Sequence, residues 1–400
     1  MRRAPWWGIF GAVFVSSWGG NQFSPLLLMY EDRAHYSAVL VNLFLGVYVL
    51  GLAPALLMAG PLSDRHGRRP VLLAGLCAAL VGSFLLAFGG LNPIFLAVGR
   101  LFSGVTVGVA MAVGNSWIKE LSDPPYDPSG DPAAGARRAS LAFTLGSGTG
   151  ALVAGLIAQW GPLPEVLPFA IHLAVTAPFL WVVLRTPETS PGGVPGPWWN
   201  QLRVPAASHR RFTRVVCLAG PWIFVGAAVG YGYLPTRLHE ATGSWGLVFA
   251  TAAGAIALGI SSLIQPLAKR LHSFDSARGL VASLLALTLS FALVGASILQ
   301  QSVWLGLLAN VAVGAGMGIG LVSGLLEVQR IAGARDLAGL TGRFYAVSYA
   351  GFLAPSLMAP LAPVLSVGVM FALLTLLAVT CYAVLVVRSR QHLPAVAQTQ

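Results

Sequence analysis

Charged side chains are scarce in this sequence. They make up 9% of the 400 residues, whereas about 25% is typical of a soluble domain. With 24 basic and 13 acidic residues, the chain cannot cover a surface that faces water. Apolar residues account for 56% of the composition, and the mean hydropathy is +0.76. These values exclude a soluble globular enzyme, a disordered protein and a secreted disulfide scaffold, and they indicate a chain that lies in lipid.

Cysteines and the usual sequence signatures of catalysis are also rare or missing. Cys77, Cys217 and Cys381 lie within apolar runs, and their spacing fits neither a disulfide framework nor a metal site. The sequence contains no Gly-x-x-x-x-Gly-Lys-(Ser/Thr) motif, so it lacks this phosphate-binding loop for ATP. No pairing of a nucleophile with a base stands out. We therefore expect no enzyme activity, no cofactor and no metal.

Long apolar runs dominate the sequence instead. A helix that crosses a bilayer needs about 20 mostly apolar residues. The runs reach this length and lack the period-two alternation of membrane strands. Helices of this length leave room only for short loops and for no large soluble domain. The twelve predicted spans are 7–30, 37–59, 71–90, 93–118, 139–160, 166–184, 212–235, 245–267, 279–299, 302–326, 337–361 and 365–387.

The basic residues predict the orientation, because Arg and Lys are concentrated in cytoplasmic loops. With the N-terminus in the cytoplasm, every Arg and Lys except Arg33, Arg100 and Arg237 falls in a cytoplasmic segment. An even number of spans places the C-terminus in the cytoplasm as well. Topology then explains the formal charge of +11, and no nucleic-acid partner is expected. Arg2 and Arg3 precede a long span without a cleavage pattern, so we expect no cleaved signal peptide.

The sequence divides into two similar halves. A basic stretch rich in proline, 185–211, is interpreted as a cytoplasmic linker between an N-terminal bundle, 1–184, and a C-terminal bundle, 212–400. The run Pro-Leu-Ser-Asp-Arg at 61–65 is echoed by Pro-Leu-Ala-Lys-Arg at 266–270. Two parallel halves of six helices are typical of secondary transporters, in which the substrate binds near the midplane. The predicted fold is an all-α membrane protein with 12 transmembrane helices in two pseudo-symmetric bundles of six.

The loop between the second and third spans carries the most specific motif, GPLSDRHGRRP at 60–70. It resembles the loop signature of the major facilitator superfamily, Gly-x-Leu-(Ala/Ser)-Asp-Arg-x-Gly-Arg-(Arg/Lys). The resemblance covers essentially the whole chain, because the motif, its loop position and the number of spans agree. It implies a secondary transporter that works by alternating access, the two halves rocking about a central site. The matching residues are Gly60, Leu62, Asp64, Arg65, Gly67, Arg68 and Arg69.

The same loop predicts a conformational latch. Asp64 is an anion at a cytoplasmic helix end, where it can interact with the positive N-terminus of a neighbouring helix. The resemblance implies that this neighbour is the eleventh span and that the contact closes the cytoplasmic side in the outward-facing state. Arg68 or Arg69 is expected to pair with Glu120, although the arginines could instead only set the orientation. The predicted latch comprises Gly60, Asp64, Arg65, Gly67, Arg68, Arg69 and Glu120.

Polar side chains within spans are the candidates for the substrate site. The resemblance implies that spans 1, 4, 7 and 10 line the cavity. Arg100, followed by spaced glycines, is similar to a second family signature and is a candidate either for anion binding or for a structural bond to backbone carbonyls. For a single Asn or Tyr the alternative is an interhelical hydrogen bond or an interfacial position. The predicted substrate-binding residues are Asn21, Gln22, Arg100, Asn115, Trp117, Tyr231, Tyr233, Asn310, Arg343, Tyr345 and Tyr349.

The coupling ion is less clearly marked in the sequence. The fifth span reads Gly-Ala-Leu-Val-Ala-Gly at 150–155, a degenerate form of the Gly-Pro-x-x-Gly-Gly found in antiporters of the family. Small residues are also common at any interface between membrane helices. Glu327 and Asp336 are the candidate coupling residues. Glu327 could form a titrating pair with Arg330 or Arg343, or a static ion pair.

Together these patterns favour proton-coupled efflux of a small amphipathic organic molecule by antiport across the plasma membrane, which is the inner membrane of a bacterial cell. One alternative is uptake of a metabolite or an organic anion by symport or uniport, which is favoured if Arg100 and Arg343 both reach the cavity. A non-transporting membrane receptor is a second alternative. The expected partners are a small-molecule substrate, the lipid bilayer and protons, and the chain is expected to be a monomer.

Overall fold

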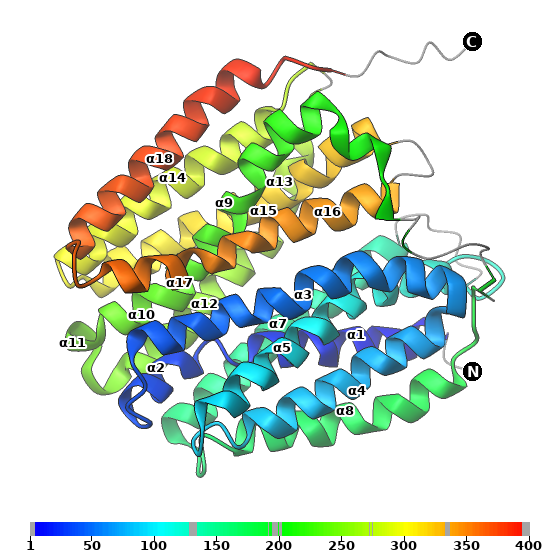
Figure 1. Cartoon of the computed structure of the whole chain (residues 1–400), viewed down its shortest axis with the longest axis horizontal. Coiled ribbons are helices and arrows are strands. Elements are labelled where there is room, and N and C mark those ends of the chain that lie inside the picture. The colour runs from blue at the N-terminus through cyan, green and yellow to red at the C-terminus, as the bar shows by residue number, and fades with distance from the viewer. Residues whose placement is uncertain are drawn as a thin grey trace. The chain divides into compact units, whose positions relative to one another are not determined.

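The computed structural model describes residues 5–127, 134–190, 192–193, 199, 202–271, 273, 275–332 and 337–393, and within these ranges it contains helices and loops without a strand (Figure 1). Eleven helices in the described ranges are long and apolar enough to cross a membrane. The predicted class, an all-helical membrane protein, is confirmed.

The chain forms two compact units. Met1–Leu202 and Gly243–Ala255 make up the first unit, and Arg203–Thr242 and Ile256–Gln400 make up the second. One border falls at Leu202, within the predicted linker. The helices of the first unit are α1 (Trp6–Asn21), α2 (Leu26–Asp32), α3 (Ala38–His66), α4 (Arg68–Leu86), α5 (Pro93–Val109), a π-helical segment (Ala110–Gly114), α6 (Asn115–Glu120), α7 (Ala134–Trp160), α8 (Leu167–Arg185), a short 3-10 helix (Gly243–Trp245) and the first half of α12 (Gly246–Leu263).

The second unit continues with the remainder of α12. Its helices are a 3-10 helix (Pro205–Ser208), a π-helical segment (Phe212–Val216), α9 (Cys217–Ala227), a second π-helical segment (Ala228–Tyr233), α10 (Leu234–Arg237), α11 (His239–Thr242), α13 (Gln265–Arg270), α14 (Arg278–Leu299), α15 (Val303–Ile331), α16 (Leu337–Tyr349), a 3-10 helix (Ala350–Leu353), α17 (Ala354–Met358), a further 3-10 helix (Ala359–Leu361) and α18 (Val367–Arg388).

The first predicted span, 7–30, is divided into two helices. α1 has 16 residues and α2 has 7, so neither crosses a membrane alone. Turns at residues 22–25 separate them, and α2 begins directly after Pro25. Proline has no N–H to donate to the preceding turn, so a helix is easily interrupted there. The other eleven predicted spans each correspond to one of the eleven candidate membrane helices.

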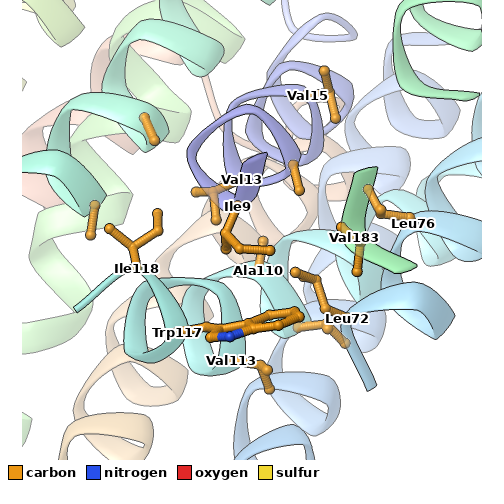
Figure 2. Close-up of a cluster of buried hydrophobic side chains, with 14 of the residues drawn as sticks. Ile9, Val13, Val15, Leu72, Leu76, Ala110, Val113, Trp117, Ile118 and Val183 are labelled. Atoms are coloured by element: carbon orange, nitrogen blue, oxygen red, sulfur yellow. The ribbon is translucent and has the colours of Figure 1, made fainter. Parts of the chain in front are cut away.

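Apolar side chains from most helices of the first unit meet in one packed cluster (Figure 2). Ile9 and Val13 enter from α1, Leu72 from α4, Trp117 from α6 and Val183 from α8, and all are fully buried. Because lipid is as apolar as these side chains, close packing rather than hydrophobic burial holds membrane helices together.

Two glycines let the backbones of α3 and α5 touch. A Cβ atom on Gly51 would lie 2.0 Å from the carbonyl oxygen of Leu101, and one on Gly104 would lie 2.1 Å from that of Tyr48. Both distances are far inside van der Waals contact, so each position requires glycine. This contact fixes α5, and with it Arg100, against α3.

Candidate functional site

The loop between α3 and α4 has the geometry expected of a charged latch element. Gly67 joins the two helices at φ +97°, a left-handed conformation that favours glycine. The Arg68 guanidinium lies 2.7 Å from Asp64 and 2.8 Å from Glu120, and it donates a further hydrogen bond to Ser63. Of the two arginines predicted to pair with Glu120, the structure places Arg68 there. The predicted contact of Asp64 with the eleventh span would join the two units and stays a prediction.

The chain that follows α8 lies over this loop. The Glu188 carboxylate accepts hydrogen bonds from the backbone N–H groups of Arg68 and Arg69, at 3.0 and 2.8 Å, and so caps the N-terminus of α4. Thr189 donates to Glu120 at 2.5 Å, and the N–H of Gly193 donates to the carbonyl of Arg65 at 2.9 Å. The start of the predicted linker is therefore bound to the motif loop within the first unit, rather than a free tether.

Replacing Glu188 with alanine is expected to lower the stability of the first unit by about 1 kcal/mol, the usual cost of losing a helix cap. The two N–H groups of α4 would lose their carboxylate partner. The midpoint of thermal unfolding of the purified protein in detergent measures the effect. Glu188→Gln is the matched control, because its amide keeps one acceptor oxygen and should recover part of the loss. Equal midpoints for Glu188→Ala and the wild type would contradict the capping role.

The break between α1 and α2 holds two of the predicted substrate-binding residues. Asn21 is partly exposed, and its amide donates to the Ser147 hydroxyl of α7 at 3.0 Å and to the carbonyl of Ser17 at 3.1 Å. Gln22 is fully buried, and its amide donates to the Ser83 hydroxyl of α4 at 3.3 Å. Of the two, only Asn21 has an exposed surface.

Arg100 of α5 contacts the last turn of α1 at the same break. Its side chain, 2% exposed, donates to the carbonyl of Gly20 at 3.0 Å and to that of Phe44 at 3.4 Å. The guanidinium also lies over the rings of Phe23 and Tyr48, at 4.8 and 4.4 Å. A cation at the C-terminal end of α1 stabilises the carbonyls that the break leaves without helical partners. This is the structural bond to backbone carbonyls that the sequence left open as an alternative.

The two other candidates of the fourth span have different surroundings. Trp117 is fully buried in the packed cluster of the first unit (Figure 2), and its indole N–H donates to the carbonyl of Pro187 at 3.1 Å. Asn115 is partly exposed and follows the π-helical segment Ala110–Gly114. Its side-chain oxygen is buried without a hydrogen-bond partner. Asn115 thus remains a candidate, whereas Trp117 has a packing role.

In the second unit, three candidates gather at the π-helical segment Ala228–Tyr233. Tyr231 and Tyr233 belong to this segment and are buried. Asn310 of α15 donates to the carbonyl of Gly230 at 3.1 Å and to that of Gly306 at 2.9 Å. A π-helical turn leaves irregular backbone groups to satisfy, and such turns are frequent at functional sites. The Asn310 amide supplies one of the missing donors, as expected for an interhelical hydrogen bond.

The candidates of the eleventh span belong to α16. Tyr349 stacks on Phe224 of α9, with ring centroids 3.9 Å apart, and Tyr345 lies beside Phe344 at 5.4 Å. Arg343 donates to the carbonyl of Val204 at 3.3 Å. The structure therefore gives the two tyrosines aromatic neighbours and ties the arginine to the start of the second unit.

Glu327 of α15 forms a buried ion pair that the sequence only partly predicts. Its two oxygens accept from Arg211 at 2.5 and 3.0 Å, and Arg330 adds a contact at 3.2 Å. Arg211 is fully buried and also donates to the carbonyls of Ser389 and Gln391. Of the two predicted partners the structure thus pairs Arg330 with Glu327, and Arg211 is an additional partner. The other coupling candidate, Asp336, lies outside the described residues.

Sequence reasoning missed Arg211 and Glu188 for the same reason. Both lie in the stretch 185–211, whose composition is typical of a linker, and a basic residue there counts only toward orientation. The one available sequence signal was an acidic residue, Glu188, in the run Pro187-Glu188-Thr189 directly after a span, which could have suggested a contact with a neighbouring helix end. Among the described residues, no group of three or more His, Cys, Asp or Glu side chains is placed to hold a metal ion.

Comparison with known proteins identifies the family. A family model described as Major Facilitator Superfamily matches residues 9–355. The chain belongs to the Major Facilitator Superfamily. Its family and its apolar helices make it an integral membrane protein.

Solved structures of the superfamily share the fold. The nucleoside transporter NupG has a TM-score of 0.71 at 14% identity, covering 96% of this chain and 99% of that one. The xylose transporter XylE from E. coli has a TM-score of 0.69 at 13% identity, covering 95% and 96%. At such low identity the likeness concerns the fold alone, and it confirms the predicted fold class.

Relatives in sequence carry names that point to different compounds. The chloramphenicol resistance protein of Pseudomonas aeruginosa is 25% identical over 251 residues, covering 60% of this chain and 57% of that protein. The gallate transporter of Pseudomonas putida is 34% identical over 143 residues, covering 36% and 30%. The chain spans between 28% and 57% of the length of the first curated relatives that it matches.

Proposed function

We propose that this transporter exports a small amphipathic organic molecule in exchange for protons, by alternating access of its two halves. It acts as a monomer in the plasma membrane, the bacterial inner membrane, with both termini in the cytoplasm. The observation that carries the proposal is the similarity, over 60% of the chain, to a protein named for chloramphenicol resistance. The degenerate antiporter motif at 150–155 agrees with this direction.

Uptake of an organic anion is the competing function, and the similarity to a gallate transporter favours it. An anion site needs a cation with a free face, as in bidentate recognition of a carboxylate. Arg100 offers little to such a ligand in this structure, because it is 2% exposed and directed at two backbone carbonyls and two rings. This arrangement supports export over anion uptake.

The latch is part of the proposed cycle. Asp64, Arg68 and Glu120 form a charged cluster at one end of the first unit, and Glu188 fixes the α4 terminus beside it. We infer that breaking and reforming contacts of this cluster switches the access of the site between the two sides of the membrane. Arg68 pairs with both Glu120 and Asp64 and so holds the motif loop, while the Asp64 side chain stays 43% exposed for a further contact.

Transport in inside-out membrane vesicles tests the proposed export. An acidic vesicle lumen is expected to drive accumulation of radiolabelled chloramphenicol, because protons leaving the lumen exchange for the solute. A protonophore should abolish the accumulation, and vesicles from cells that lack the protein are the control. Accumulation of labelled gallate in right-side-out vesicles, without chloramphenicol transport, would support uptake instead. Saturable binding of either solute without flux would support a receptor.

The latch is measured in the same vesicles with Asp64→Asn. The amide keeps the size of the side chain and removes its charge, so initial rates of transport are expected to fall while the protein remains folded. Unchanged rates for this variant would remove Asp64 from the latch.

A further inference from the structure

One titratable side chain lies deep in the first unit and has no part in the site described above. His172 of α8 is fully buried, and its ring lies between α1 and α4. Its Nε2 is 2.9 Å from the carbonyl oxygen of Val15, and its Nδ1 is 2.7 Å from the Ser83 hydroxyl. A carbonyl only accepts, so the hydrogen is assigned to Nε2, and Nδ1 accepts from Ser83. Gly19 leaves room for the ring, since a Cβ there would lie 2.8 Å from it.

The hydrogen bonds continue from the ring to the break between α1 and α2. Ser83 accepts from the Gln22 amide at 3.3 Å, and Gln22 is the first residue after α1. Gln22 is fully buried, and its amide oxygen has no hydrogen-bond partner. Leaving such an oxygen buried and unpaired is costly, so its place in the structure calls for an explanation.

The chain of hydrogen bonds can reverse its direction. When a proton binds the lone pair of Nδ1 on His172, that nitrogen becomes a donor to the Ser83 oxygen. The hydroxyl of Ser83 must then turn toward another acceptor, and the unpaired oxygen of Gln22 serves once its amide has rotated. One proton is gained, and only hydrogen bonds are exchanged. The unpaired oxygen in the present structure is thus the acceptor that the protonated state requires.

Among the residues that the structure describes, the polar groups in contact with the ring are neutral. They are the Val15 carbonyl from α1, Ser83 from α4 and Thr176 from α8, whose hydroxyl is 3.2 Å from Nε2. The cation on the neighbouring helix α5, Arg100, is bound to Gly20, next to Gly19. Burying a charge without a counter-charge is costly, so proton uptake at this ring favours a different packing around the break.

We infer that His172 is a proton-binding group of this transporter and that Ser83 and Gln22 transmit its charge state to the break between α1 and α2. The inference rests on the proposed proton coupling and names its site. Glu327 is less suited to the role, because both of its oxygens accept from Arg211 and a proton there would displace one of these hydrogen bonds. In the His172 chain, both ring nitrogens have a partner in the neutral state, and in the protonated state they would donate to Val15 and to Ser83.

Proteoliposomes that hold a pH-sensitive dye test the inference. Purified full-length protein is given a gradient of chloramphenicol, then of gallate, and proton movement is recorded along with solute exchange at equal pH on both sides. For the wild type, a solute gradient is expected to move protons. His172→Gln should lose the proton movement and retain the exchange, since the Gln amide can still donate to Val15 but cannot take up a proton. Gln22→Met, which removes both the acceptor oxygen and the amide that donates to Ser83, should shift the pH dependence of transport.

Thr176→Val is the matched control. It removes a hydroxyl beside Nε2 of the same ring but leaves the hydrogen bonds from Nδ1 through Ser83 to Gln22 in place. It should retain both proton movement and exchange. Unchanged proton movement in His172→Gln would overturn the inference while leaving proton-coupled export intact. Solute exchange without proton movement in the wild type would overturn the proposed coupling instead. In that event, a nitrogen NMR titration of His172, with its signals assigned from the Gln variant, shows directly whether the ring binds a proton. A ring that stays neutral across the pH range overturns the inference.

Discussion

Arg211→Ala is expected to lower the free energy of unfolding by about 3–5 kcal/mol, the usual cost of removing one partner from a buried ion pair. Arg211 is fully buried, and the Glu327 side chain that it holds is 5% exposed. Without the guanidinium, the carboxylate would keep only Arg330, and the carbonyls of Ser389 and Gln391 would lose their donor. The second unit would thus lose the contact between α15 and the end of α18. The unfolding midpoint of the purified protein in detergent measures the loss.

Two further variants separate the charge from the packing. The double variant Arg211→Leu with Glu327→Met is expected to recover most of the stability, because replacing a whole buried pair with apolar residues is often neutral. Arg330→Ala should cost much less than Arg211→Ala, because Glu327 keeps both hydrogen bonds from Arg211. If the single and double variants were equally unstable, the loss would come from packing and not from an uncompensated charge.

The sequence predicted the helices well and their irregularities poorly. Apolar runs define membrane spans because the bilayer fixes their length, so eleven spans were recovered. Pro25 marks the break after α1, yet Pro54 and Pro61 lie within the unbroken α3. Neighbouring groups in a membrane protein can satisfy the backbone that a proline frees, so a proline alone does not predict a break. At the break of α1 the neighbouring group is Arg100, from a helix far away in the sequence.

The candidate site shows the same limit. Pairing of Arg68 with Glu120 was predicted because the motif loop and the end of the fourth span carry opposite charges on the same predicted side of the membrane, although the two residues are 52 positions apart. The partners of Arg100 and Glu327 depend instead on how distant helices pack, and neither Phe44 nor Arg211 carries a sequence signal that points to them. Polar residues within spans were correctly singled out as costly, but in the folded protein most of these side chains satisfy backbone groups or each other.

Gly146→Ala and Gly148→Ala are expected to have opposite effects on stability, although they make the same change two residues apart on α7. A Cβ on Gly146 would lie 2.1 Å from the carbonyl oxygen of Phe14 and 2.2 Å from the Ser17 hydroxyl. The backbone of α1 would have to move, and overpacking of this kind costs about 1–3 kcal/mol. A Cβ on Gly148 would meet nothing within 4 Å, so its variant should gain up to about 1 kcal/mol from the better helix propensity of alanine.

The unfolding midpoints of the two variants show whether the glycines of the fifth span serve helix packing or the transport cycle. Gly150, which opens the degenerate antiporter motif, also faces α1, since a Cβ there would lie 2.6 Å from the carbonyl of Trp18. Close approach of α1 and α7 therefore requires small residues at 146 and 150 whichever way the solute moves. A destabilised Gly146→Ala beside an unharmed Gly148→Ala would assign this spacing to helix packing. If both variants kept the wild-type midpoint and lost transport, the glycines would instead serve the conformational cycle. The motif at 150–155 would then support antiport.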